Sequence, residues 1–145
     1  SVYKNLIYPL QIRHIHPDEN KTDELLRKAG LLGQKRQYAR SLSSGERQKL
    51  SFLRAVIFQP KLVMIDETFS NLDTESETLF IEMIREIQKK EPITWIIVSH
   101  QLEAVHQLCE TIHYMEKGSV IKNETIAGRY RGSGQREIEK GHTGA

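Results

Sequence analysis

The sequence predicts an α/β fold in which helices pack on a parallel sheet. Two short apolar runs, at residues 62–65 and 93–98, have the continuous hydrophobicity of strands that are buried on both faces. Between them, residues 75–90 place apolar side chains on one stripe and Glu and Lys side chains on the opposite one, which is typical of an amphipathic helix. A strand, a helix and a second strand in this order favour a right-handed crossover between parallel strands.

The first 40 residues are predicted to be helical with interruptions. Apolar residues recur at near-helical spacing over residues 2–13, but Pro9 predicts two helical pieces with a break between them. Another helix is expected to end at Gly30, and either Thr22 or Asp23 could cap its start.

A longer helix is predicted over residues 45–58, before Pro60. The string LSSGERQ at 42–48 opens it with a Ser/Gly turn, and the free N–H groups of a first helical turn attract anions. The basic residues ahead of this helix, Lys35, Arg36 and Arg40, are interpreted as a solvated face.

The end of the chain predicts a helix over residues 101–109 and then two short strands, Thr111–Met115 and Ser119–Ile121, joined by a turn at Lys117 and Gly118. From residue 127 the chain is rich in Gly, Arg, Lys and Glu and has little apolar content. We expect residues 127–145 to form a disordered tail.

Composition limits the class of protein. The 145 residues are 38% hydrophobic, which suffices for one modest core. The 21 basic and 19 acidic residues leave a net charge of +2, too balanced to indicate a nucleic acid or an anionic membrane as partner. No apolar segment approaches the ~20 residues that a bilayer requires, so any membrane association is expected to come through a partner.

Chemically useful residues follow the two predicted strands. The string LVMIDE at 62–67 ends in Asp66 and Glu67, and acids at a strand end can hold Mg²⁺ and orient water. SNLD follows at 70–73. The string ITWIIVSH ends in His100, which is therefore expected at the carboxyl edge of the sheet, where nucleotides bind in open α/β folds.

In this order, LSSGE, LVMIDE, SNLD and the final histidine resemble the signature motif, Walker B, D-loop and switch histidine of an ATP-binding-cassette (ABC) transporter ATPase. The resemblance implies a P-loop NTPase-like parallel sheet with part of the helical subdomain. Residues 1–40 would belong to that subdomain and residues 41–126 to the C-terminal part of the ATPase core. No G-x-x-x-x-G-K-[ST] string occurs, so we expect a fragment that lacks the P-loop and is inactive alone.

The resemblance also implies ATP and Mg²⁺ as cofactors and gives roles to particular residues. Asp66 would help to hold Mg²⁺. Glu67 would orient or deprotonate the attacking water, and His100 would contact the γ-phosphate. The residues that would meet nucleotide across a dimer seam are Ser43, Ser44, Gly45, Glu46 and Asp73.

Three residues depart from the commonest pattern of the family. Ser44 stands in place of Gly, Glu46 in place of Gln and Thr68 in place of Pro. A carboxylate near a triphosphate is unfavourable unless it points away, so Glu46 is expected to weaken the contacts with ATP rather than to remove them.

The predicted function is the nucleotide-binding, ATP-hydrolysing subunit of an ABC membrane transporter. It would act at the cytoplasmic face of the membrane, with a second nucleotide-binding subunit and a transmembrane permease, and without nucleic acid. One alternative is a soluble ABC-class ATPase of DNA repair or chromosome organisation, which would place a long coiled coil before the signature, where this chain has Pro9, Pro17 and Gly30. The other is a non-hydrolysing regulatory module, against which Glu67 and His100 argue.

Overall fold

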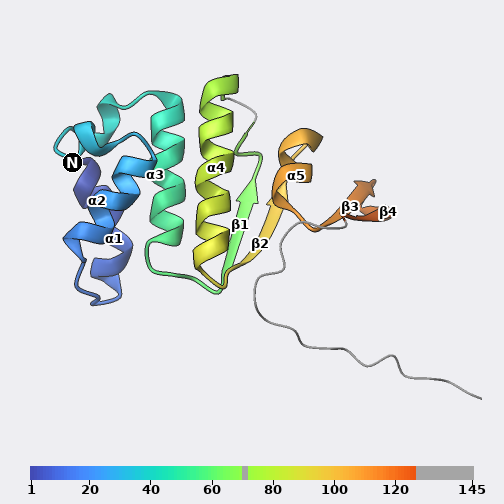
Figure 1. The fold of residues 1–145 in the computed structure, drawn as a ribbon, viewed down its shortest axis with the longest axis horizontal. Helices are drawn as coiled ribbons and strands as arrows, with labels where there is room; N and C mark the ends of the chain where they lie inside the picture. The colour runs from blue at the N-terminus through green and yellow to red at the C-terminus, as the bar shows by residue number, and fades with distance from the viewer. Residues whose placement is uncertain (70–71, 127–145) are drawn as a thin grey trace, which may run out of the picture. The chain divides into compact units, whose positions relative to one another are not determined.

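The computed structural model describes residues 1–69 and 72–126, and the chain divides into one compact unit, Ser1–Cys109, and a second that begins at Glu110. The first unit contains five α-helices and two strands among its described residues (Figure 1). They are α1 (Val2–Ile12), α2 (Glu19–Lys28), α3 (Ser44–Val56), β1 (Leu62–Asp66), α4 (Thr74–Lys90), β2 (Thr94–Val98) and α5 (Leu102–Leu108). Short 3-10 turns at Leu32–Gln34 and Ala39–Ser41 connect α2 to α3.

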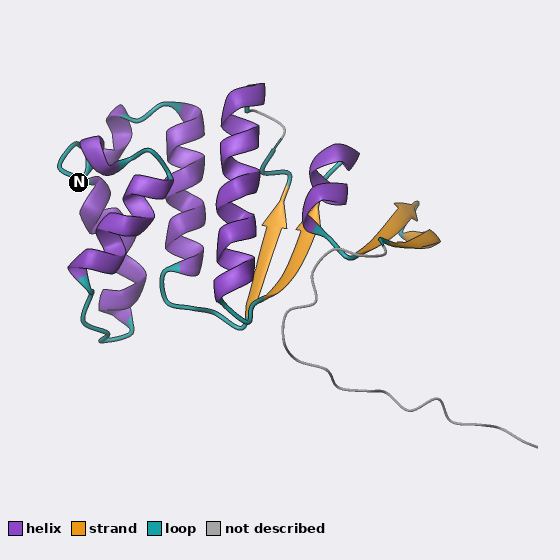
Figure 2. Cartoon of the chain, viewed as in Figure 1, coloured by secondary structure: helices purple, strands orange, loops and turns teal. Residues whose placement is uncertain are grey.

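The two strands are parallel, as predicted, and pair from Leu62 opposite Thr94 to Asp66 opposite Val98. Figures 1 and 2 show α3 and α4 running side by side, with their N-terminal ends at the same upper side as the arrowheads of β1 and β2. The carboxyl ends of the strands and the first turns of both helices therefore lie at the same side of this unit.

An aromatic cluster holds these layers together. The Phe52 ring of α3 meets the Phe80 ring of α4 edge to face at 5.0 Å and stacks against Trp95 of β2 at 6.0 Å. Phe69, which follows β1, also meets Phe80, at 5.7 Å. Aromatic pairs contribute about 0.5–1.5 kcal/mol each beyond the burial of their area, so this cluster helps to fix the two strands relative to the helices.

The prediction that both strand faces are buried is wrong for this unit. Successive side chains of β1 point to opposite faces, and only the face toward the helices is covered. Val63 and Ile65 are buried there, whereas Met64 on the other face is 71% exposed. In β2 the same alternation leaves Ile96 and Val98 exposed.

The predicted break at Pro9 is also wrong, because α1 runs without interruption from Val2 to Ile12 with Pro9 inside it. Proline removes one backbone hydrogen bond from a helix. The buried face of α1 packs against α3, and this packing outweighs the missing bond.

Helix α2 begins earlier than predicted, at Glu19, and neither Thr22 nor Asp23 is its cap. The Asp18 carboxylate caps the helix by accepting the N–H groups of Asn20 and Lys21 at 2.9 and 3.2 Å. Thr22 lies inside the helix, is buried and donates its hydroxyl to the Asp18 carbonyl at 2.7 Å.

The remaining elements of this unit agree closely with their predicted ranges, whereas the last strand of the chain, β4 (Ser119–Thr125), extends four residues beyond its predicted end at Ile121. Helix α3 starts at the predicted Ser/Gly turn. The apolar stripe expected over residues 75–90 is present in α4, where Phe80, Ile81, Met83, Ile84 and Ile87 are buried and Leu79 is exposed. Every helix in the described ranges is too short or too polar to cross a membrane.

The second unit contains the predicted hairpin, in which β3 (Thr111–Glu116) pairs antiparallel with β4 (Ser119–Thr125). Lys117 and Gly118, with φ values of 48° and 79°, form its two-residue turn. Residues 127–145, where the sequence predicts a disordered tail, lie outside the described residues.

Candidate active site at the carboxyl ends of the strands

Glu67 and His100 meet at the carboxyl edge of the sheet. Glu67 follows β1 directly and His100 lies two residues beyond β2, so parallel pairing brings both to the same edge. The His100 Nδ1 atom lies 2.7 Å from the Glu67 Oε2 atom. The Glu67 backbone N–H donates to the carbonyl of Val98 at 2.9 Å, which extends the strand pairing to the site itself.

The backbone turns sharply at Glu67, where φ is 48°. Residues other than glycine avoid this left-handed region, because it costs them about 1–2 kcal/mol. Those that adopt it are often found at functional sites, where the backbone must direct a side chain in a particular way. The turn confirms the prediction that the Asp-Glu pair lies where the strand ends, and it frees Glu67 from the strand's alternation of faces.

Both side chains are open to solvent, with the Glu67 side chain 45% and the His100 side chain 69% exposed. A carboxylate beside an imidazole can accept a proton or orient a water molecule, and the ring holds the carboxylate in place. The arrangement is therefore accessible and suited to acid–base chemistry on a molecule that arrives from outside.

Asp66 is exposed at the last position of β1, and the segment after it is tied to α3. The Gln48 side-chain amide donates to the backbone carbonyl of Thr68, and the Thr68 hydroxyl donates to the Asp66 carbonyl at 3.4 Å. A small cavity of about 140 Å³, which Gln48, Asp66 and Thr68 help to line, lies between α3 and β1.

The residues present fit Mg²⁺ only as partial ligands. No cluster of three or more His, Cys, Asp or Glu side chains that could hold a metal occurs within residues 1–69 and 72–126. Mg²⁺ in nucleotide sites commonly takes one or two carboxylates and completes its shell with phosphate oxygens and water. The Asp66 carboxylate at the open sheet edge matches that requirement.

The signature turn, residues 43–46, opens α3 with a complete capping box. The Ser43 Oγ atom accepts the Glu46 N–H at 3.2 Å, and the Glu46 carboxylate accepts the Ser43 N–H at 2.7 Å. The Gln34 side-chain amide donates to the second Glu46 oxygen at 3.1 Å. The Glu46 carboxylate is therefore folded back onto its own turn, and the Ser43 hydroxyl proton is not used in the cap.

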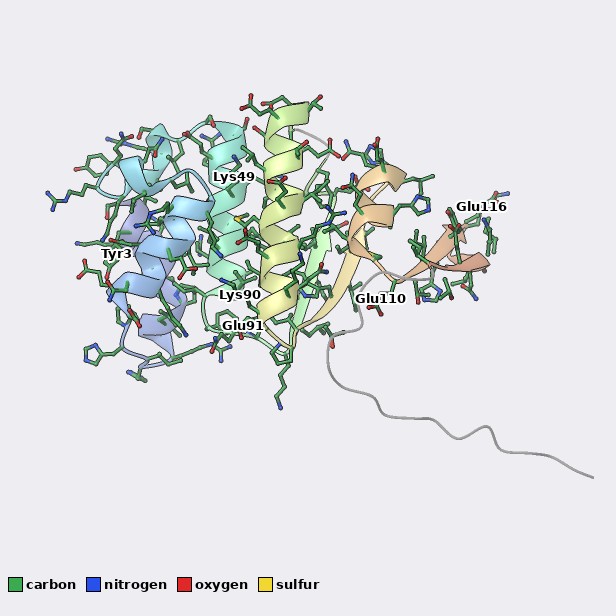
Figure 3. All side chains as sticks on the ribbon, in the orientation of Figure 1. Tyr3, Lys49, Lys90, Glu91, Glu110 and Glu116 are labelled. Carbon is green, nitrogen blue, oxygen red and sulfur yellow. The ribbon has the colours of Figure 1, made fainter. Side chains whose placement is uncertain are left out.

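The segment after β1 approaches Gly45 in this turn. A Cβ atom at Gly45 would lie 3.4 Å from the Leu72 side chain, at the limit of ordinary contact. Ser43 and Ser44 on the same turn are exposed. Farther along α3, Lys49 lies on the helix surface (Figure 3).

Asp73 caps the N-terminus of α4. Its carboxylate accepts the Ser76 N–H at 2.8 Å and the Ser76 hydroxyl at 3.2 Å. These bonds, with a smaller contribution from the positive charge of Lys49, hold the pKa of the Asp73 carboxyl below its ordinary value. Its neighbours in the SNLD string, residues 70 and 71, lie outside the described residues.

The eight predicted site residues thus form three groups: the pair Glu67 and His100 with Asp66 beside it, the signature turn, and the Asp73 cap. Sequence reasoning gave no role to Gln48 or to Leu72, which connect α3 to the segment after β1. Gln48 belongs to the LSSGERQ string itself, so its position in that string was the available signal.

Comparison with known proteins places this arrangement in context. Residues 1–70 match the family model described as ABC transporter. The methionine import ATP-binding protein MetN of Geobacillus kaustophilus is 26% identical over 133 residues, which are 90% of this chain and 39% of the relative. MetN 1 of Staphylococcus epidermidis is 30% identical over 128 residues, covering 87% of this chain and 38% of the relative.

Two solved structures share the fold. CbiO1 from Clostridium perfringens, part of the ABC transporter complex cbiONQ, has a TM-score of 0.71 and 24% identity, and the match covers 86% of this chain and 51% of CbiO1. An ATP-binding cassette of an ABC transporter in its ADP conformation has a TM-score of 0.70 and 20% identity, with 86% and 55% covered. These matches confirm the predicted resemblance and the α/β fold of the P-loop NTPase type. The chain spans about 39% of the length of the curated relatives it matches.

Proposed function

Because this chain is related to the ATP-binding proteins of ABC transporters, we propose that it forms part of the nucleotide-binding, ATP-hydrolysing subunit of a membrane transporter. The observation that carries the proposal is the 2.7 Å contact between His100 and Glu67 at the carboxyl edge of the parallel sheet. Since the chain spans only part of its relatives, the activity is proposed for the complete protein.

The strand-end residues would divide the chemistry among them. Bound ATP and Mg²⁺ would supply the phosphoryl group and the metal charge at this edge. The Asp66 carboxylate would serve as a ligand of the Mg²⁺ shell, directly or through water. Glu67 would orient a water molecule and accept its proton at a carboxylate oxygen. His100 has Nδ1 toward Glu67, and Nε2, on the opposite side of the ring, would donate to a phosphate oxygen when the ring is protonated.

The signature turn would complete the nucleotide site of a second subunit. Exposed Ser43 and Ser44 support this role, because a partner's nucleotide could reach them. The Ser43 hydroxyl keeps its proton for donation to a phosphate, while the capping box holds the Glu46 carboxylate on the Ser43 backbone N–H. Gly45 would permit close approach of the backbone, and Asp73 would lie across the dimer seam.

A transmembrane partner and a place at the cytoplasmic face of the membrane complete the proposal. They are supported by CbiO1, which is part of a transporter complex, and by relatives named for methionine import, which favour an importer. The described helices before the signature, α1 and α2, have 11 and 10 residues and are too short for the coiled-coil arm of a chromosome-organising ATPase.

The decisive experiment replaces Glu67 by Gln in the full-length protein. Gln keeps the shape of the side chain but cannot accept a proton, so turnover should fall by about 10²–10⁴-fold while ATP binding is kept. ATP trapped between two subunits should then give a dimer on gel filtration with ATP and Mg²⁺. Glu82→Gln, an exposed change in the middle of α4, is the matched control and should leave turnover unchanged. Turnover by Glu67→Gln near the wild-type rate would contradict the proposal.

A further inference from the structure

A second concave site lies away from the strand ends, between α1, the 3-10 turn Ala39–Ser41 and α3. Its volume is about 270 Å³, several times the ~30 Å³ that one water molecule occupies in the liquid. No acidic residue lines it. The polar side chains that line this site, here named the arginine pocket, are Asn5, Arg40, Arg47, Ser51 and Arg54.

Helical geometry explains how the arginines gather. Arg47 and Arg54 are seven residues apart on α3, so they lie on one face of the helix, about 10 Å apart along its axis. Packing of α1 against α3 brings Asn5 to the same place, and the turn before the signature adds Arg40. Arg40, interpreted from the sequence as part of a solvated helix face, lies in the 3-10 turn at the rim of this pocket.

None of the three guanidinium groups forms an ion pair with another described residue. Arg47 donates to the backbone carbonyl of Leu42. Arg40 lies over the ring of Tyr38, 5.2 Å from its centroid. The Nε atom of Arg54 is buried and has no hydrogen-bond partner among the described residues. A buried donor without an acceptor is costly, because its bonds to water have been lost and not replaced.

Other cations in the same unit are neutralised, so the unpaired arginines do not reflect a shortage of acids. Lys28 contacts Glu86 at 2.6 Å and Glu24 at 3.3 Å. Lys35, a few residues before Arg40 in the sequence, contacts Asp23 at 2.6 Å and Glu19 at 3.2 Å. The arginine pocket instead concentrates positive charge that guanidinium groups cannot lose by deprotonation.

We propose that the arginine pocket binds an oxyanion, namely a phosphate or carboxylate group of a small ligand. Planar guanidinium groups bind both by paired hydrogen bonds, and an oxyanion would provide the acceptor that the Arg54 Nε atom lacks. Asn5 and Ser51 supply neutral donors at the same site. The pocket is built without Asp66, Glu67 or His100, so this inference does not rest on the proposed function.

Thermal unfolding of the full-length protein tests the proposal. The midpoint temperature of unfolding is measured in two series at constant ionic strength. Inorganic phosphate replaces chloride in the first series, and acetate replaces chloride in the second. A ligand that binds the folded state raises the midpoint with the logarithm of its concentration once that concentration exceeds the dissociation constant. Arg54→Gln and Arg40→Gln remove pocket donors, and Arg27→Gln, an exposed change on α2, is the matched control. Phosphate bound at any nucleotide site affects all four proteins equally.

We expect at least one of the two anions to raise the midpoint of the wild type and of Arg27→Gln. Its apparent affinity should fall about tenfold in Arg54→Gln, the usual loss for a hydrogen bond to a charged group. Arg40→Gln, which changes an exposed residue, should also weaken anion binding. It provides the test of the proposal if Arg54→Gln does not fold. A response to phosphate alone identifies a phosphate ligand, and a response to acetate identifies a carboxylate. No response in the wild type, or equal responses in all four proteins, would overturn the proposal.

Discussion

The strand-end site and the signature turn use similar polar residues in opposite ways. In the signature turn, the side chains of Ser43 and Glu46 each accept the backbone N–H of the other residue, which caps the start of α3. At the strand ends, Glu67 and His100 are exposed and face one another, and the backbone of Glu67 is in the left-handed region. The first arrangement stabilises the start of α3 whatever else the turn does. The exposed pair at the strand ends adds little to the stability of the fold, so we look to function for its explanation.

The largest effect that separates the two regions should come from Glu67→Gly. Glycine removes the carboxylate, so turnover of the full-length protein should fall by about 10²–10⁴-fold. Stability should change by less than about 1 kcal/mol, because relief of the left-handed backbone offsets the greater conformational freedom of the unfolded chain and the loss of exposed side-chain contacts. Steady-state ATPase assays and urea unfolding measure the two quantities.

Gln59→Gly is the matched control for this change. Gln59 lies between α3 and β1, has a φ of 53° and donates to the Glu91 carboxylate at 2.8 Å on the surface. It therefore shares with Glu67 the left-handed backbone and an exposed side-chain contact, without lying at the strand ends. Stability should respond as in Glu67→Gly and turnover should stay at the wild-type level. A large loss of stability in Glu67→Gly alone would mean that the strand-end pair supports the fold.

The sequence was sufficient to predict those features that depend on local pattern. Periodicity predicted β1, α4 and β2 and the parallel pairing, and the Lys117–Gly118 turn predicted the hairpin. The convergence of Glu67 and His100 also followed, because parallel strands end at one edge. These inferences need only neighbours in sequence and one rule of topology.

Features that depend on tertiary packing could not be predicted in this way. The uninterrupted α1 depends on its contact with α3, which a local penalty for Pro9 ignores. The exposure of Met64 depends on which elements cover the sheet, and the apolar run itself is the same for one covered face or two. The arginine pocket joins Asn5 to Arg47 and Arg54, which are more than 40 residues away.

A smaller effect is expected at the signature turn, where Ser43→Ala should destabilise the protein by about 1 kcal/mol, the usual cost of losing an N-cap. Ser44→Ala is the control, because Ser44 is the first helical residue and alanine favours helices, so stability should stay within about 0.5 kcal/mol of the wild type. Denaturant unfolding with an unchanged slope would measure both. Equal stability of the two variants would show that the capping box contributes nothing to stability. The signature turn would then not differ from the strand ends in its contribution to the fold.

The smallest effect concerns Asp73, the cap of α4 at the same side of the unit. Hydrogen bonds from Ser76 lower the pKa of the Asp73 carboxyl in the folded protein below its ordinary value of 3.8. The unfolded chain therefore takes up the proton first, so this carboxylate stabilises the fold above about pH 4 and loses that contribution as the pH falls through the folded pKa. Asp73→Asn keeps an equally good cap without a titrating group, so it should match the wild type at pH 7 and lose less stability between pH 4 and pH 2.

Urea unfolding across this range measures the difference, with Glu82→Gln in the middle of α4 as the control for removing an acid from this helix. If Asp73→Asn loses stability in acid as steeply as the wild type, the Ser76 bonds do not hold the carboxylate in the folded protein, and the cap of α4 would not depend on the charge of Asp73.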